Sequence, residues 1–185
     1  MPINKTKKLC IPTLERGNEK INNHSTHPVS LTHYINTKNV NTMFGNNRNE
    51  LRQVYLSCWQ LKKNKLPMDP MQEVVATIVE KHPEYHQLLE DDEVVDKDFS
   101  ADTGESNPFL HMSMHIALHE QISTNRPDGI HDCYQKLCLL HGGPHDAEHA
   151  MMECLGEALW QAQRDQTAPN EEKYLDCLKK IVQTG

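Results

Sequence analysis

From about residue 44 onward, apolar residues recur every three or four positions, which is the spacing of one buried face of an α-helix. In "NTMFGNNRNELRQVYLSCWQLKK" this spacing joins Leu51, Val54, Tyr55, Cys58 and Trp59. The pattern predicts an amphipathic helix of about 16 residues.

The segment "PMDPMQEVVATIVEKHP" predicts a second helix with a well-marked start. Asp69 suits the N-cap, Pro70 the first helical position, and Gln72 the third position of a capping box. Pro83 is expected to close this helix, because the residue before a proline disfavours helical backbone angles.

The remaining segments continue the helical pattern. "PEYHQLLEDDE" predicts one short helix, followed by an acidic loop over residues 90–106. Asn107–Pro108 repeats the cap-plus-proline start and opens a helix that "STNRPDG" ends. Further helices are predicted from Ile130, over about 144–166, and after Asn170 as N-cap.

No segment alternates convincingly between apolar and polar residues, so no strand is expected. We therefore predict an all-α fold, a compact bundle of about five to six helices over residues 43–185. Residues 1–42 show no periodicity and are predicted to be a flexible basic extension, mostly disordered. This extension holds six of the 19 basic and two of the 26 acidic residues, a net charge of +4 against −11 for the remainder.

Composition narrows the functional classes. An acidic body makes nucleic acid an unlikely partner, because phosphate binding draws on clustered Lys and Arg. No apolar run approaches the length of a membrane span, and the first residues do not resemble a secretory signal. The six scattered cysteines form no CxxC pair, which favours reduced, mostly buried thiols in a cytoplasmic protein. A protein partner or a homo-oligomer stays open.

Two histidine clusters carry the candidate chemistry. "NPFLHMSMHIALHEQ" places His111, His115 and His119 one helical turn apart in a helix that is apolar almost all round. These rings are therefore expected to face protein. "HDAEHAMME" adds His145 and His149, with Glu148 between them in the middle of the apolar face.

A buried carboxylate costs several kcal/mol unless it is paired or bound to a metal. We therefore predict that His111, His115, His145 and His149 bind a divalent metal such as Zn, Fe, Mn or Ni. Glu148 is predicted to be a further ligand, or a catalytic acid or base beside a metal-bound water. No substrate follows from the sequence.

The competing interpretation is a non-enzymatic protein-interaction domain, in which the histidines and Glu148 form a hydrogen-bonded polar core. His119 is the weakest ligand candidate. The remaining histidines of the helical region are expected in solvent: His82, His86, His131 and His141.

Two known metal-binding motifs do not fit this sequence. His145, Glu148 and His149 spell HxxEH, but the enzymes with that motif have a much larger α/β domain and a distant further ligand. The di-iron bundle signature is also absent, because Glu153 has no histidine three residues later.

Four motifs together resemble a bacterial family, the domain of unknown function 1841: "HPEYHQLLED", "NPFLHMSMHIALHEQIS", "RPDGI" and "HDAEHAMMECLGEALWQAQRD". The resemblance covers about residues 43–183 and implies a small helical cytoplasmic protein without an established activity. It also implies histidine at the positions of His111, His115 and His149. The family usually has a basic residue where His119 stands, which demotes His119 further.

Overall fold

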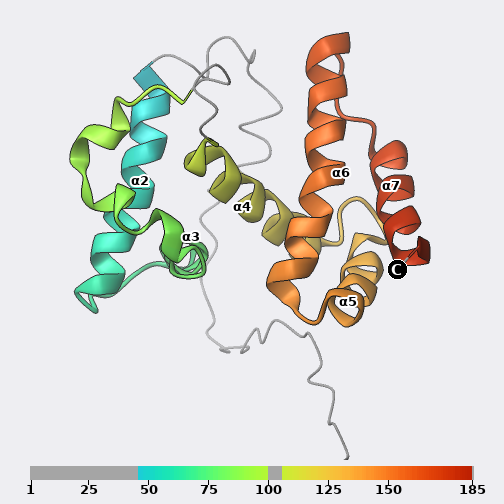
Figure 1. Ribbon diagram of the computed structural model, residues 1–185, viewed down its shortest axis with the longest axis horizontal. Helices are drawn as coiled ribbons and strands as arrows, with labels where there is room; N and C mark the ends of the chain where they lie inside the picture. Colours follow the sequence, from blue (N-terminus) through green and yellow to red (C-terminus); the bar gives the residue numbers. More distant parts are fainter. Residues whose placement is uncertain (1–45, 100–105, 185) are drawn as a thin grey trace, which may run out of the picture.

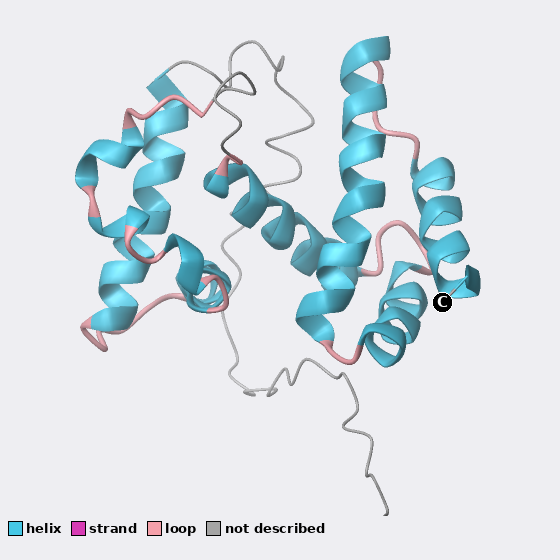
Figure 2. Ribbon diagram, viewed as in Figure 1, coloured by secondary structure: helices cyan, strands magenta, loops and turns pink. Residues whose placement is uncertain are grey.

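The computed structural model describes residues 46–99 and 106–184, and within them it contains helices and no strand (Figure 2). The six α-helices are α2 (Asn46–Lys63), α3 (Pro70–Glu80), α4 (Pro108–Thr124), α5 (Ile130–His141), α6 (Pro144–Asp165) and α7 (Glu171–Thr184). The predicted all-α fold is confirmed. The predicted extension over residues 1–42 lies outside the described residues. None of the described helices is long and apolar enough to cross a lipid bilayer.

The predicted helix starts are confirmed at atomic detail. Asp69 accepts a hydrogen bond from the backbone N–H of Gln72, whose side chain accepts in return from the Asp69 N–H. Asn107 caps α4 through the N–H groups of Phe109 and Leu110. Each cap satisfies backbone donors that the first helical turn leaves without a partner.

The stretch between α3 and α4 departs from the prediction. Instead of one short α-helix and an open loop, it forms three 3-10 turns: η2 (Pro83–Tyr85), η3 (Leu88–Glu90) and η4 (Asp92–Val95). Leu89, Val94 and Val95 are all buried, although these three positions would not share one face of a continuous α-helix. Short turns can redirect the chain between them, so each apolar side chain reaches the core.

Arg52 of α2 anchors this irregular stretch from inside. Its side chain is only 4% exposed, and its guanidinium donates to the carbonyl oxygens of Val95 at 2.8 Å and Lys97 at 2.6 Å. The same guanidinium lies over the rings of Phe99 and Phe109. A buried cation thus pairs with carbonyls and aromatic faces.

The buried apolar side chains form two separate cores, and α4 contributes to both. Figure 1 shows α4 between α2 and α3 on one side and α5, α6 and α7 on the other. The N-terminal unit comprises α2, α3, the 3-10 turns and the first half of α4, with Phe109, Met112 and Ile116 in its core. The C-terminal unit comprises the second half of α4, with Leu118 and Ile122, together with α5, α6 and α7. Because α4 contributes side chains to both cores, it connects the two units.

The cysteines correct one expectation. Cys154 of α6 and Cys177 of α7 form a disulfide, with Cα atoms 5.8 Å apart. Cys58, Cys133 and Cys138 are buried and lie outside this disulfide, as predicted, and Cys10 lies outside the described residues. Cys154 and Cys177 are 23 positions apart in the sequence, and this spacing did not indicate that the two residues lie opposite each other on packed helices.

Candidate metal centre

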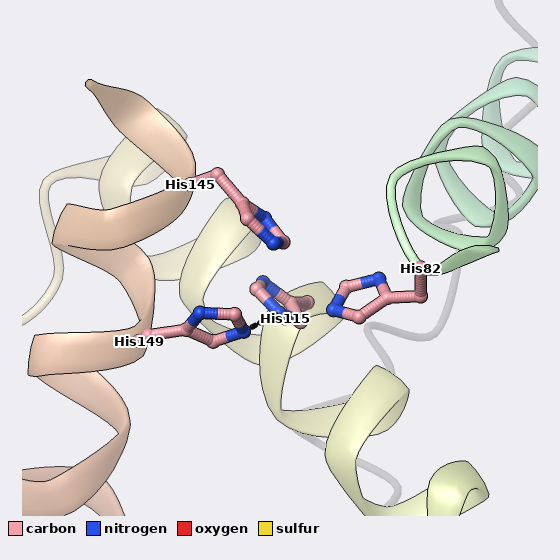
Figure 3. A group of neighbouring side chains, drawn as sticks. All are labelled: His82, His115, His145 and His149. Carbon is pink, nitrogen blue, oxygen red and sulfur yellow. Dashed lines mark hydrogen bonds between the residues drawn. The ribbon is translucent and has the colours of Figure 1, made fainter. Parts of the chain in front are cut away.

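Five histidine side chains converge where the two units meet. Two come from α4, two from the first turns of α6, and one from the second residue after the end of α3. Figure 3 shows four of them pointing their rings toward one another. We call this set the histidine centre: His82, His111, His115, His145 and His149.

Helical spacing explains most of this arrangement. His111 and His115 lie one turn apart on α4, and their ring centroids are 5.1 Å apart. His145 and His149 are likewise one turn apart on α6, with ring centroids 4.3 Å apart. Because α4 and α6 pack together, the two pairs face each other across the helix interface.

The ring nitrogens come as close as hydrogen-bonded atoms. The Nε2 atom of His111 lies 3.1 Å from the Nε2 atoms of both His82 and His149. The Nε2 atom of His149 is also 3.3 Å from that of His115. One candidate ligand atom from each of four rings lies within 4.8 Å of the others, the rings being those of His82, His115, His145 and His149.

Two of the rings have a fixed tautomer. The Nδ1–H of His82 donates to the carbonyl oxygen of Ile78 at 2.7 Å, and that of His115 donates to the Glu148 carboxylate at 2.7 Å. A carbonyl and a carboxylate only accept, so the hydrogen must lie on Nδ1. In the neutral rings, the Nε2 atoms of His82 and His115 therefore carry lone pairs directed into the centre.

No set of neutral tautomers satisfies all the contacts. Each N···N contact needs one hydrogen and one lone pair, and each Nε2 atom offers one or the other. If His111 and His149 donate to the outer pair, their own two hydrogens oppose each other across 3.1 Å. If either keeps a lone pair instead, that lone pair opposes the one on His82 or His115. The centre is thus left with at least one repulsive contact.

A further nitrogen lacks a partner altogether. The Nδ1 atom of His145 is buried and makes no hydrogen bond. Its ring stacks on that of His115 at 5.4 Å and contacts the ring of His82 at 4.9 Å. Buried polar atoms are rarely left unsatisfied in folded proteins, so this one calls for an explanation.

The surroundings favour the neutral form of three of the rings. Burial, together with a smaller contribution from the neighbouring histidines, lowers the pKa of His111 to about 4. Burial also lowers the pKa of His115, outweighing the opposing effect of Glu148, and the pKa of His145 is lowered for the same main reason. Neutral imidazoles are the form in which histidine binds metals.

Glu148 lies beside the centre and is held by it. Burial by itself would raise the pKa of this carboxyl, but the hydrogen bond from His115 and the charge of Lys81 outweigh burial, so its pKa is lowered. Its side chain is 15% exposed. The carboxylate thus stays ionised and orients the ring of His115 from behind.

Measured against the sequence prediction, the structure brings His111, His115, His145 and His149 together and places Glu148 in contact with His115. It corrects the expectation for His82, which is 1% exposed and belongs to the centre. His86 is also not free in solvent, because its ring stacks on Trp59. His119 is exposed and outside the centre, as its demotion anticipated.

His82 was missed because it follows the end of a helix, where a wheel of helical positions no longer applies. The sequence feature that could have indicated His82 was its position between the end of α3 and Pro83, which restricts the backbone there. The direction in which the chain turns after α3, which decides where His82 points, could not be predicted from the sequence.

Within the described residues, the fold and the centre define an all-α protein with a buried histidine cluster between two cores. The chain belongs to the family described as Domain of unknown function (DUF1841), whose model matches residues 47–180. No curated protein and no solved structure matches the chain. The family is described without a function, so the function has to be argued from the site.

Proposed function

We propose that this protein binds a divalent transition-metal ion at the histidine centre. The observation that carries the proposal is the convergence of ring nitrogens whose hydrogens cannot be arranged to satisfy one another. An ion at the centre would accept the lone pairs of all these nitrogens and remove the repulsive contact. It would also give the orphaned Nδ1 atom of His145 a partner.

The nitrogen separations support the same proposal. Ligand nitrogens about 2.0–2.1 Å from a tetrahedral zinc ion lie about 3.3 Å from one another. The Nε2 separations of 3.1 Å and 3.3 Å between His149 and its two α4 partners match that spacing. Hydrogen-bonded ring nitrogens lie at similar separations, so the spacing is compatible with coordination, and the unmatched lone pairs distinguish the two cases.

The donors limit the kind of ion. The proposed ligands are imidazoles alone, which suit Zn, Ni, Fe or Cu and disfavour the oxygen-seeking Mg and Ca. Manganese, which prefers oxygen ligands, fits this set less well. We assign no reaction, because the described residues do not identify a substrate.

For Glu148 we propose an orienting role. A carboxylate that accepts from the far nitrogen of a ligand histidine fixes its tautomer and raises its basicity, a common arrangement around protein-bound metals. Glu148 meets this description through His115. The acid–base role that the sequence suggested would need the same carboxylate to face an ion-bound water.

The competing possibility is a purely structural polar core within a protein-interaction domain. Such a core is stable when every buried polar atom finds a partner. The unpartnered Nδ1 atom of His145 and the frustrated Nε2 contacts speak against it here. The two possibilities predict opposite results in one measurement.

The test is elemental analysis and calorimetric titration of the full chain, purified without a histidine tag. We expect one transition-metal ion per chain. His149→Ala should lower the affinity by more than the roughly 10–100-fold that loss of an outer-shell partner costs, and Glu148→Gln should fall within that range. His119→Ala and His141→Ala remove exposed histidines outside the centre and should leave the affinity unchanged.

Circular dichroism of each variant separates loss of a ligand from loss of the fold. A folded wild-type chain that takes up no stoichiometric ion, or variants outside the centre that weaken binding as much as His149→Ala, would overturn the proposal and favour the structural core.

A further inference from the structure

The position of the histidine centre in the fold carries an inference that goes beyond metal binding and rests on the proposed function. α4 is the described helix that packs extensively against both units: it contacts α3 on one side, and α5 and α6 on the other. The two hydrophobic cores divide along α4 between Ile116 and Leu118. Away from α4, the ring of His82 joins the two units through its contacts with the rings of His145 and His149.

His82 is the ligand candidate that crosses this junction. It belongs to the N-terminal unit, since its Nδ1–H is bonded to the carbonyl oxygen of Ile78 in α3. Its ring nevertheless contacts the rings of His145 and His149 in α6, with centroids 4.9 Å and 5.8 Å away. Figure 3 shows it reaching toward α6 from the end of α3.

The remaining ligand candidates do not connect α3 with the C-terminal unit. His111 and His115 lie on α4, which is already packed on α6, and His145 and His149 lie on α6 itself. An ion held by these four alone would stabilise a pair of helices that already touch. An ion that also binds His82 would tie α3, and α2 packed on it, to the start of α6.

Without an ion, the same junction is strained by its own contacts. The Nε2 atoms of His82 and His111 are 3.1 Å apart, and His111 must satisfy His149 at the same distance. Whichever neutral tautomers these rings adopt, one contact in the set stays repulsive.

We infer that the metal ion is the joint between the two units, and that ion binding through His82 closes α2 and α3 onto the C-terminal unit. Thermodynamic linkage then requires a reciprocal effect. The ion favours the closed arrangement by the same factor by which closure raises affinity for the ion. Couplings of this kind are typically about 10–100-fold.

The experiment measures amide hydrogen exchange of the full-length protein with and without saturating Zn²⁺. In the wild type, Zn²⁺ should slow exchange in α2 and α3 by about 10–100-fold, as well as in α4 and α6. In His82→Ala, Zn²⁺ bound to the four remaining histidines should still slow exchange in α6, with little effect in α2 and α3. His119→Ala is the matched control and should behave like the wild type.

The outcomes separate the two proposals. If Zn²⁺ binds and slows exchange only in α4 and α6 of the wild type, the joint is disproved while the metal centre stands. If His82→Ala keeps the full protection of α2 and α3, the joint is again disproved. If the titration finds no bound Zn²⁺, the proposed function fails first, and the joint fails with it. The wild-type comparison decides the matter even should His82→Ala not fold.

Discussion

The two units of this protein bury their apolar side chains in different ways. The C-terminal unit is built from regular helices that follow one another through short connections, and a disulfide ties α6 to α7. The N-terminal unit pairs two helices with a run of 3-10 turns over residues 83–95, which α2 holds through the buried side chain of Arg52. Periodic packing thus suffices in one unit, whereas the other needs a polar anchor.

The units also supply the histidine centre differently. α6 presents His145 and His149 from consecutive turns, so helix geometry alone sets their spacing. The N-terminal unit, apart from α4, presents His82 from a position just beyond a helix end, fixed by one hydrogen bond to Ile78. A site built from both can therefore be disturbed from either side, by loosening the anchor of one unit or the crosslink of the other.

The largest effect is expected from the anchor. Arg52→Met keeps the apolar stem but removes both hydrogen bonds to the carbonyl oxygens of Val95 and Lys97. Hydrogen bonds to charged groups contribute about 1.5–3 kcal/mol each, so we expect the free energy of unfolding to fall by about 4 kcal/mol. Urea denaturation followed by circular dichroism measures the change.

Lys63→Met serves as the control for Arg52→Met. Lys63 forms an exposed ion pair with Glu90, and such pairs contribute at most about 1 kcal/mol. Equal losses from the two variants would show that Arg52 is an ordinary surface cation and that the N-terminal unit has no polar anchor.

The second effect concerns the crosslink of the C-terminal unit. Replacing Cys154 and Cys177 together by serine removes a bond between positions 23 residues apart. Constraint of the unfolded chain by a loop of this size contributes about 3 kcal/mol, so thermal unfolding should occur at a lower temperature in the variant. Scanning calorimetry with and without a reducing agent checks the cause.

A reducing agent should lower the unfolding temperature of the wild type toward that of the double variant and leave the variant unchanged. In a reducing compartment the wild type would behave like the variant, because both would lack the bond. If neither the reductant nor the double substitution changes the unfolding temperature, the crosslink contributes no stability.

These two predictions also show which parts of the fold could be predicted from the sequence and which could not. The helices of the C-terminal unit followed from apolar spacing and from caps such as Asn170, because local rules decide them. The 3-10 turns did not follow, because the path of this stretch depends on Arg52, which bonds the carbonyl oxygen of Val95 from 43 positions earlier. A long-range contact of that kind has no local signature.

The same division applies to the histidine centre. His111, His115, His145 and His149 could be predicted as one site because each pair lies one helical turn apart on an apolar face. His82 and the disulfide could not be predicted, since both depend on which segments meet in space. The role of Glu148 changed for the same reason: only the structure shows that His115 occupies its carboxylate.

The smallest loss of stability is expected where helices start, and it should differ between the two units. Asp69 closes a capping box at α3, whereas α6 begins at Gly143 without a side-chain cap. Asp69→Ala should therefore lower the free energy of unfolding by about 1 kcal/mol. Asp146→Ala, in the first turn of α6, removes only a favourable charge near the helix dipole, worth about 0.3–1 kcal/mol or less at ordinary salt concentration.

Denaturation in low and high salt distinguishes the two variants, because salt screens a dipole interaction but has little effect on a direct hydrogen bond. If the loss in Asp69→Ala also disappears in high salt, the cap of α3 acts through charge alone, and the starts of the two helices differ less than their geometry indicates.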